Sequence, residues 1–107
     1  MNMKDLRGIA EGFARDLKAK YGGRVARILL FGSVARNEAR EDSDIDLLLV
    51  TPERNHNLQW EVAKDATDLL LREGLLASVL VVTEAEWRDA GDTLFGHRVR
   101  SEGLVLA

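Results

Sequence analysis

The sequence contains no cysteine and a single proline among its 107 residues. Without cysteine there is no disulfide framework, no thiolate metal ligand and no cysteine nucleophile. A long apolar run is also missing, because no window approaches the roughly 20 apolar residues that a membrane helix needs. Charged side chains are spread over residues 1–17, unlike the continuous apolar stretch of a secretory signal. We therefore expect a cytoplasmic protein that does not enter a membrane.

An excess of positive charge is lacking as well. The chain has 15 basic and 18 acidic side chains, for a formal net charge of −3. Proteins that bind duplex nucleic acid usually carry a basic patch that displaces counterions from the phosphates. The basic residues here are scattered among acidic ones, apart from a loose group at His97, Arg98 and Arg100. Direct duplex binding is therefore not expected, whereas a small polyphosphate neutralised by a metal ion is compatible with this charge.

The composition present is that of an ordinary globular protein. Hydrophobic residues make up 46% and charged residues 31% of the chain, which excludes intrinsic disorder. The length predicts a single domain over residues 1–107. A chain of this size forms one core, but not a deep, enclosed active site of its own. We therefore expect a shallow site that a partner completes.

Hydrophobic periodicity and turn residues predict alternating helices and strands. We expect long helices over residues 3–21 and 58–73, strands over 25–31, 45–50 and 77–82, short helices at 34–38, 84–88 and 93–100, and a terminal apolar run at 104–106. The stretch over residues 45–50, apolar apart from Asp46, predicts a strand buried on both faces. Thr83 and Glu86 fit a capping box, and Gly74 is a typical helix stop. This order of elements predicts an α/β domain.

The first functional motif is Gly32-Ser33, directly after the first predicted strand. Gly32 has no side chain, so another group can approach its backbone closely. Ser33 is expected to be the N-cap of the short helix that follows. Backbone amides at such a turn, together with the Ser33 hydroxyl, favour a phosphate group.

The second motif is Asp44-Ile45-Asp46, at the start of the second predicted strand. Carboxylates two residues apart on a strand leave the same face, where they repel each other. A divalent cation removes this repulsion, and magnesium prefers carboxylate, water and phosphate oxygens. Each motif alone is typical of an ordinary turn or strand entry. In this order, the two together predict a nucleotide–metal site.

The two segments that carry these motifs are FGSVAR at 31–36 and DSDIDLLLV at 42–50. They resemble the minimal nucleotidyltransferase family of the DNA polymerase β superfamily, whose signature is Gly-Ser followed at some distance by Asp-x-Asp. The resemblance extends over most of the chain. It implies the nucleotidyltransferase fold, in which helices pack on a small mixed sheet. It also implies ATP as substrate and Mg²⁺ as cofactor.

The resemblance assigns roles to individual residues. It implies that Gly32 and Ser33 hold the β- and γ-phosphates, and that Asp44 and Asp46 bind magnesium. Arg36 either neutralises phosphate charge or pairs with a neighbouring acid, Glu38 or Asp42. The expected catalytic residues are Asp44, Asp46 and Ser33, the expected metal ligands are Asp44 and Asp46, and the expected nucleotide-binding residues are Gly32, Ser33, Arg36 and Ser43.

One part of the family pattern is missing. Active members of the superfamily usually carry a third carboxylate on a later strand, but the strand predicted here contains neither Asp nor Glu. Ser78 or Leu80 stands where that carboxylate is expected, and Glu73 and Glu84 lie beyond the ends of the strand. A positioned general base typically contributes on the order of 10²–10⁴-fold in rate. The departure therefore weakens the prediction of catalysis more than that of binding.

Three functions remain open from the sequence. The resemblance implies an enzyme that transfers AMP from ATP to a partner protein, acting as the antitoxin of a HEPN-type helical ribonuclease toxin. Alternatively, the domain is a catalytically degenerate nucleotide-binding module that neutralises its partner by occlusion. A third interpretation is nucleotide sensing without a toxin.

The remaining histidine and tryptophan residues do not suggest another site. His56 and His97 lack the spacing of a zinc site. We expect His56 to be a loop residue and His97 to be a surface or interface residue. Trp60 and Trp87 lie in helical patterns, where packing in a core or an interface explains them better than base stacking.

Overall fold

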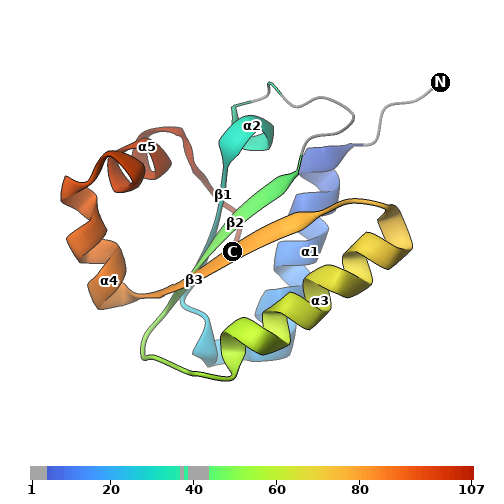
Figure 1. Ribbon diagram of the computed structural model, residues 1–107, viewed down its shortest axis with the longest axis horizontal. Coiled ribbons are helices and arrows are strands. Elements are labelled where there is room, and N and C mark those ends of the chain that lie inside the picture. The colour runs from blue at the N-terminus through green and yellow to red at the C-terminus, as the bar shows by residue number, and fades with distance from the viewer. Residues whose placement is uncertain (1–4, 37, 39–43) are drawn as a thin grey trace.

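The computed structural model describes residues 5–36, 38 and 44–107. In chain order the elements are α1 (Leu6–Tyr21), η1 (Gly22–Arg24), β1 (Arg27–Phe31), α2 (Gly32–Ala35), β2 (Ile45–Thr51), α3 (Leu58–Glu73), β3 (Ala77–Thr83), α4 (Glu84–Asp89), η2 (Ala90–Asp92), α5 (Leu94–Glu102) and β4 (Leu104–Val105) (Figure 1). The predicted α/β order is therefore confirmed. No helix within these described ranges is long and apolar enough to cross a membrane.

The four strands form one mixed sheet in the order β3-β2-β1-β4. β1 is antiparallel to both β2 and β4, while β2 and β3 are parallel and joined through α3. β2 is therefore an internal strand. Leu47, Leu48, Leu49 and Val50 have no exposed surface, so the predicted burial of this strand on both faces is confirmed.

Helices cover the two faces of the sheet unequally (Figure 1). On one face α1 and α3 pack over the main core, which includes Phe13, Leu47 and Val62. On the other face α4 and α5 build a smaller core around Leu48 and Trp87. The part of this second face at Ser78 and Leu80 of β3 is less covered, because Ser78 is exposed and Leu80 is 43% exposed. This partly open face carries the candidate site.

Local sequence signals set the ends of several elements. Asp5 caps α1 by accepting a hydrogen bond from the Gly8 amide at 3.0 Å. α3 ends at Gly74, which adopts φ +70°, a conformation that favours glycine. Thr83 and Glu86 form the predicted capping box at the start of α4.

Some predicted boundaries are wrong by a few residues. β1 begins at Arg27, because the Val25 amide donates to the Gly22 carbonyl and closes η1. α1 begins at Leu6; the predicted start at residue 3 lies outside the described residues.

The prediction for the short helix after β1 is also wrong. α2 begins at Gly32 and ends at Ala35, and Phe31 occupies the N-cap position. Ser33 is therefore the second residue of the helix and not its cap. The positive φ of Gly32 turns the chain sharply, and the helix starts two residues earlier than the serine signal predicted, at Gly32 in place of Val34.

The two tryptophans differ in burial. Trp87 is 8% exposed and belongs to the smaller core, as the packing interpretation predicted. Trp60 is 65% exposed on α3, so it is not a core residue. Lys64 lies over its ring, with the ammonium 4.7 Å from the ring centroid.

Candidate functional site

The sheet register brings the two predicted motifs together. Gly32 follows the last residue of β1, Asp44 directly precedes β2, and Asp46 is the second residue of β2. Phe31 and Asp46 are register partners in the antiparallel pair of β1 and β2. Antiparallel partners have Cα atoms about 4.5–5.5 Å apart. The Gly-Ser turn and the Asp-x-Asp motif therefore meet at one end of the sheet.

Gly32 and Asp46 fit against each other closely. A Cβ atom added to Gly32 would collide with the Oδ2 atom of Asp46 and lie 3.1 Å from its Cγ. Gly32 also adopts φ +75°, a conformation that side chains disfavour. Glycine is thus needed here both for the turn and for the approach of the carboxylate.

Asp46 lies in an environment that disfavours its negative charge. Partial burial raises the pKa of its carboxyl group, and the neighbouring charge of Asp44 raises this pKa further. The positive charge of Arg36 acts in the opposite direction. A divalent cation would relieve both the burial cost and the repulsion, and two carboxylates supply the oxygen ligands that magnesium prefers. Within the described part of the chain, no cluster of three or more His, Cys, Asp or Glu residues could hold a metal ion.

Arg36 follows α2 and is engaged by two acids. Its Nε atom lies 2.9 Å from Glu38 and its Nη1 atom 3.3 Å from Glu102, at the end of α5. These hydrogen bonds raise the pKa of the guanidinium group. The pairing with Glu38 is one of the two alternatives expected for Arg36, whereas Asp42 lies outside the described residues. The positive charge of Arg36 nevertheless offsets part of the rise in the pKa of Asp46.

Comparison with known proteins identifies the family. The nucleotidyltransferase domain family matches residues 10–100. The chain belongs to this family. A relative from Methanocaldococcus jannaschii, named as a candidate protein adenylyltransferase, is 36% identical over 97% of this chain and 99% of its own length. A second relative of the same name from that organism is 33% identical over 77% of this chain and 58% of its own length.

Solved structures confirm the nucleotidyltransferase fold. One is a toxin–antitoxin complex with AMP-PNP, matched with a TM-score of 0.65 at 21% identity over 91% of this chain and 72% of that chain. Another contains the tri-AMPylated HEPN toxin of Shewanella oneidensis with its MNT antitoxin. It matches with a TM-score of 0.59 at 18% identity over 94% of this chain and 71% of that chain. The family and the fold inferred from the two motifs are thereby confirmed.

In this nucleotidyltransferase domain, the register of β2 and β3 shows which residue stands in the place of the third carboxylate. Ser78 is the register partner of Asp46, and Leu80 is the partner of Leu48. Side chains at paired positions leave the same face of a sheet, so Ser78 is the residue of β3 beside Asp46. Glu73 is the last residue of α3 and Glu84 the first of α4. Neither glutamate lies on β3, as expected from the sequence.

A residue that the sequence did not single out holds α2 in place. The Arg7 guanidinium donates to the carbonyl oxygen of Ala35 at 3.0 Å and approaches that of Val34 at 3.5 Å. These carbonyls end α2, where a cation is favoured by the helix dipole. Local pattern gives no signal for this contact, because Arg7 lies on α1 and 28 residues separate it from Ala35.

Of the two predicted serines, the structure describes Ser33 and not Ser43. Ser33 is half-buried on α2, and its carbonyl oxygen accepts from the Glu38 amide at 2.9 Å. Ser43 lies outside the described residues. The predicted site residues that the structure describes are therefore Gly32, Ser33, Arg36, Asp44 and Asp46.

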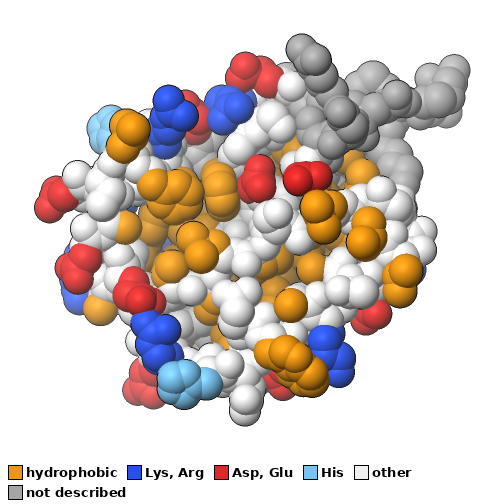
Figure 2. Space-filling view, viewed as in Figure 1, with side chains coloured by type: hydrophobic (Ala, Val, Ile, Leu, Met, Phe, Trp, Pro, Cys, Tyr) orange, Lys and Arg blue, Asp and Glu red, His pale blue; other side chains and the backbone are white. Residues whose placement is uncertain are grey.

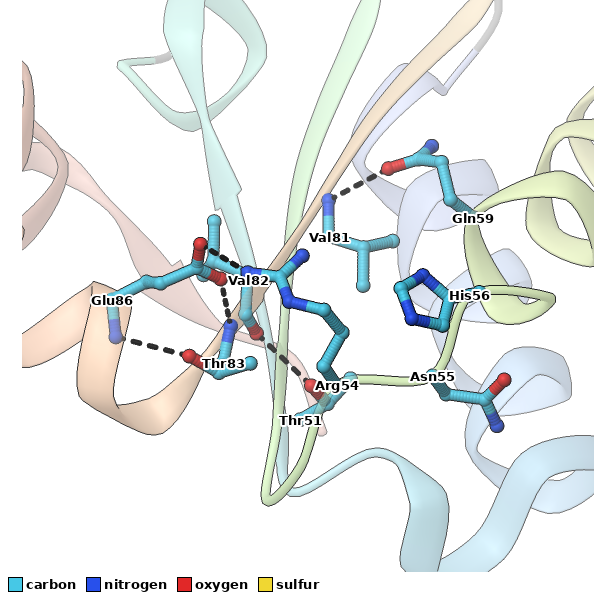
Figure 3. A pocket seen from close by; sticks show the side chains of 9 residues that line it. All are labelled: Thr51, Arg54, Asn55, His56, Gln59, Val81, Val82, Thr83 and Glu86. Atoms are coloured by element: carbon cyan, nitrogen blue, oxygen red, sulfur yellow. Dashed lines mark hydrogen bonds and ion pairs between the residues drawn. The ribbon is translucent and has the colours of Figure 1, made fainter.

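A separate hollow of 230 Å³ lies at the opposite ends of β2 and β3 (Figure 3). His56 and Thr51 line it, and Arg54 and Glu86 form an ion pair of 2.5 Å across it. Thr51 ends β2, whereas Asp46 lies near its start. This hollow is thus distinct from the candidate site at Gly32 and Asp46, and His56 lies in the connection before α3, as predicted.

Proposed function

We propose that this nucleotidyltransferase domain transfers AMP from Mg²⁺–ATP to a hydroxyl group of a partner protein, and that the partner is a HEPN-type toxin which the modification silences. The observation that carries the proposal is the meeting of the Gly32 turn with Asp46 on neighbouring strands. The near full-length relative named for protein adenylylation supports the choice of AMP and of a protein acceptor. The folds shared with toxin–antitoxin complexes support the choice of partner.

Each site residue then has a defined task. Backbone amides and the hydroxyl group at Gly32 and Ser33 would bind the terminal phosphates, and Arg36 would neutralise part of their charge. Asp44 and Asp46 would hold the metal ion. Bound Mg²⁺ supplies Lewis-acid polarisation of the phosphate oxygens.

The transfer replaces one phosphorus–oxygen bond by another. The acceptor hydroxyl oxygen bonds to the α-phosphorus, and the bond from that phosphorus to the oxygen bridging toward the β-phosphate breaks. Pyrophosphate leaves, and the hydroxyl proton passes to solvent, because β3 offers Ser78 and no carboxylate beside Asp46. Positioning of both reactants supplies a large part of such catalysis, so a bound partner would complete the shallow site.

The direct test uses ATP labelled in two positions with the purified protein pair. Label at the α-phosphate is expected to enter the toxin, and label at the γ-phosphate is not. Loss of transfer in the Asp44→Asn/Asp46→Asn double variant, with the complex still formed, would assign the chemistry to this site. Absence of label transfer with the true partner under any divalent metal would contradict the proposal.

The lack of a carboxylate on β3 favours one alternative. The domain would then bind the nucleotide but silence its partner by covering it. The same double variant separates the two functions, because full neutralisation by that variant indicates occlusion, whereas lost neutralisation with intact binding indicates chemistry.

A further inference from the structure

Two aromatic rings from distant parts of the chain meet beside the candidate site. Phe31 ends β1 and Phe95 is the second residue of α5. Their ring centroids lie 5.6 Å apart, with the ring planes at 90°. This edge-to-face geometry is a favourable arrangement for aromatic pairs. Phe31 is half-buried against the smaller core, while Phe95 is 43% exposed.

The position of this pair is fixed by the same register that builds the site. Phe31 is the antiparallel partner of Asp46, so the two side chains leave the same face of the sheet. Phe31 also directly precedes Gly32. The pair therefore borders the carboxylate on the β1 side, whereas Ser78 borders it on the β3 side. On the face seen in Figure 2, hydrophobic and acidic side chains lie next to each other over the sheet.

A nucleotide bound at this site would need an apolar neighbour for its base. Its phosphates require cationic and amide groups, but its base is a flat ring with two apolar faces. Aromatic side chains bind such faces by stacking, which is worth about 1–3 kcal/mol per base. A ring that already packs at right angles against a half-buried neighbour is held in place, so little side-chain entropy is lost when a base covers it.

We propose that Phe95, supported by Phe31, forms the nucleobase subsite of this domain; this inference rests on the proposed function. The base lies against the exposed part of the Phe95 ring while the phosphates occupy the Gly32 turn. The rings offer no hydrogen-bond donor or acceptor, so the subsite takes any purine and does not by itself distinguish adenine from guanine.

Calorimetry with two ligands tests this subsite. Mg²⁺–ATP carries a base and Mg²⁺–tripolyphosphate does not, although both carry the same phosphates. Phe95→Ala is expected to weaken ATP binding about five- to tenfold, the lower part of the range for base stacking, and to leave tripolyphosphate binding unchanged. Phe95→Tyr keeps the ring and is expected to bind ATP like the wild type. Leu94→Ala is the matched control, because Leu94 is the adjacent residue of α5 and is 74% exposed.

The outcomes separate this inference from the proposed function. If the wild type binds both ligands and Phe95→Ala binds ATP equally well, the subsite is wrong while the proposed function stands. Equal weakening of both ligands by Phe95→Ala would also overturn it, because the ring would then support the fold of the phosphate site. If the wild type binds neither ligand, the proposed function itself fails.

Discussion

The carboxylate of Asp46 occupies the space that a side chain on Gly32 would need. These two residues lie 14 positions apart in the chain, and the antiparallel pairing of β1 and β2 brings them together. The contact places a turn that suits phosphate directly against an acid that suits a metal ion. It also makes the site sensitive to a single methyl group.

Gly32→Ala is the variant that tests this contact. The added Cβ would meet Asp46, and alanine disfavours the φ of +75° found here. A left-handed conformation costs a non-glycine residue about 1–2 kcal/mol. We expect a loss of about 1–3 kcal/mol in the free energy of unfolding, measured by urea denaturation, together with loss of Mg²⁺–ATP binding.

Gly23→Ala is the matched control for that variant. Gly23 is not among the glycines with positive φ, and an added Cβ would have no atom within 4 Å. Its effect is expected to stay within about 0.5 kcal/mol. A Gly32→Ala protein with wild-type stability and ATP binding would show that the close approach of Asp46 has no functional role.

Asp46→Asn is expected to stabilise the free protein at neutral pH. Burial raises the pKa of Asp46 in the folded state above its ordinary value of 3.8. The stabilisation from its protonated form is therefore complete below that value and is lost as pH rises through the raised pKa. Asparagine removes this loss. Because the group is partly exposed, the gain stays below about 1 kcal/mol.

Thermal unfolding with and without MgCl₂ checks this second prediction. The wild type is expected to gain Tm when Mg²⁺ is added, whereas Asp46→Asn starts at a higher Tm and gains nothing. Asp68→Asn, an exposed residue of α3, should respond to Mg²⁺ like the wild type. An equal Mg²⁺ response in all three proteins would place the ion elsewhere.

Glu102→Gln is expected to strengthen nucleotide binding. Glu102 and Glu38 both hold the Arg36 side chain, so phosphates must compete with two carboxylates for this cation. An exposed ion pair contributes about 0–1 kcal/mol, which corresponds to an improvement in Kd of up to about fivefold. Calorimetry with Mg²⁺–ATP measures it. Glu84→Gln removes the exposed pair with Arg27 and should leave Kd unchanged. An equal effect of both variants would show that the gain comes from the change in net charge and not from the release of Arg36.

Ser78→Asp tests the meaning of the missing carboxylate. Ser78 is the partner of Asp46 on β3 and is exposed, so an aspartate there is tolerated by the fold. A positioned base typically contributes about 10²–10⁴-fold; we expect a gain of at least about tenfold in the rate of AMP transfer. Ser78→Asn has the same shape without the charge and should show no gain. Equal rates in the two variants would show that this position is not the site of the third acid.

Most secondary elements could be predicted from the sequence, and the two motifs could be recognised in it, because both depend on local patterns. The helix over 58–73 and its stop at Gly74 follow from hydrophobic spacing and glycine conformation. Family resemblance also predicted the strand that lacks its acid, and the register then identified Ser78 as the residue beside Asp46.

Contacts between segments that are distant in the chain could not be predicted from local sequence patterns. Glu102 reaches Arg36 across 66 residues, and Arg7 reaches Ala35 across 28. The pairing of Phe31 with Phe95 depends on where α5 packs, which no periodicity specifies. Ser33 was assigned as a helix cap from its type alone, although the turn at Gly32 starts the helix one residue before it.

The most direct measurement of the central claim is calorimetry of Mg²⁺–ATP binding to the wild type and to the Asp44→Asn/Asp46→Asn double variant. If the Gly32 turn and the two acids bind one divalent ion with its triphosphate, the wild type gives a saturable signal that depends on Mg²⁺, and the double variant gives none. Equal binding by both proteins, or no binding by the wild type, would contradict this account of the site.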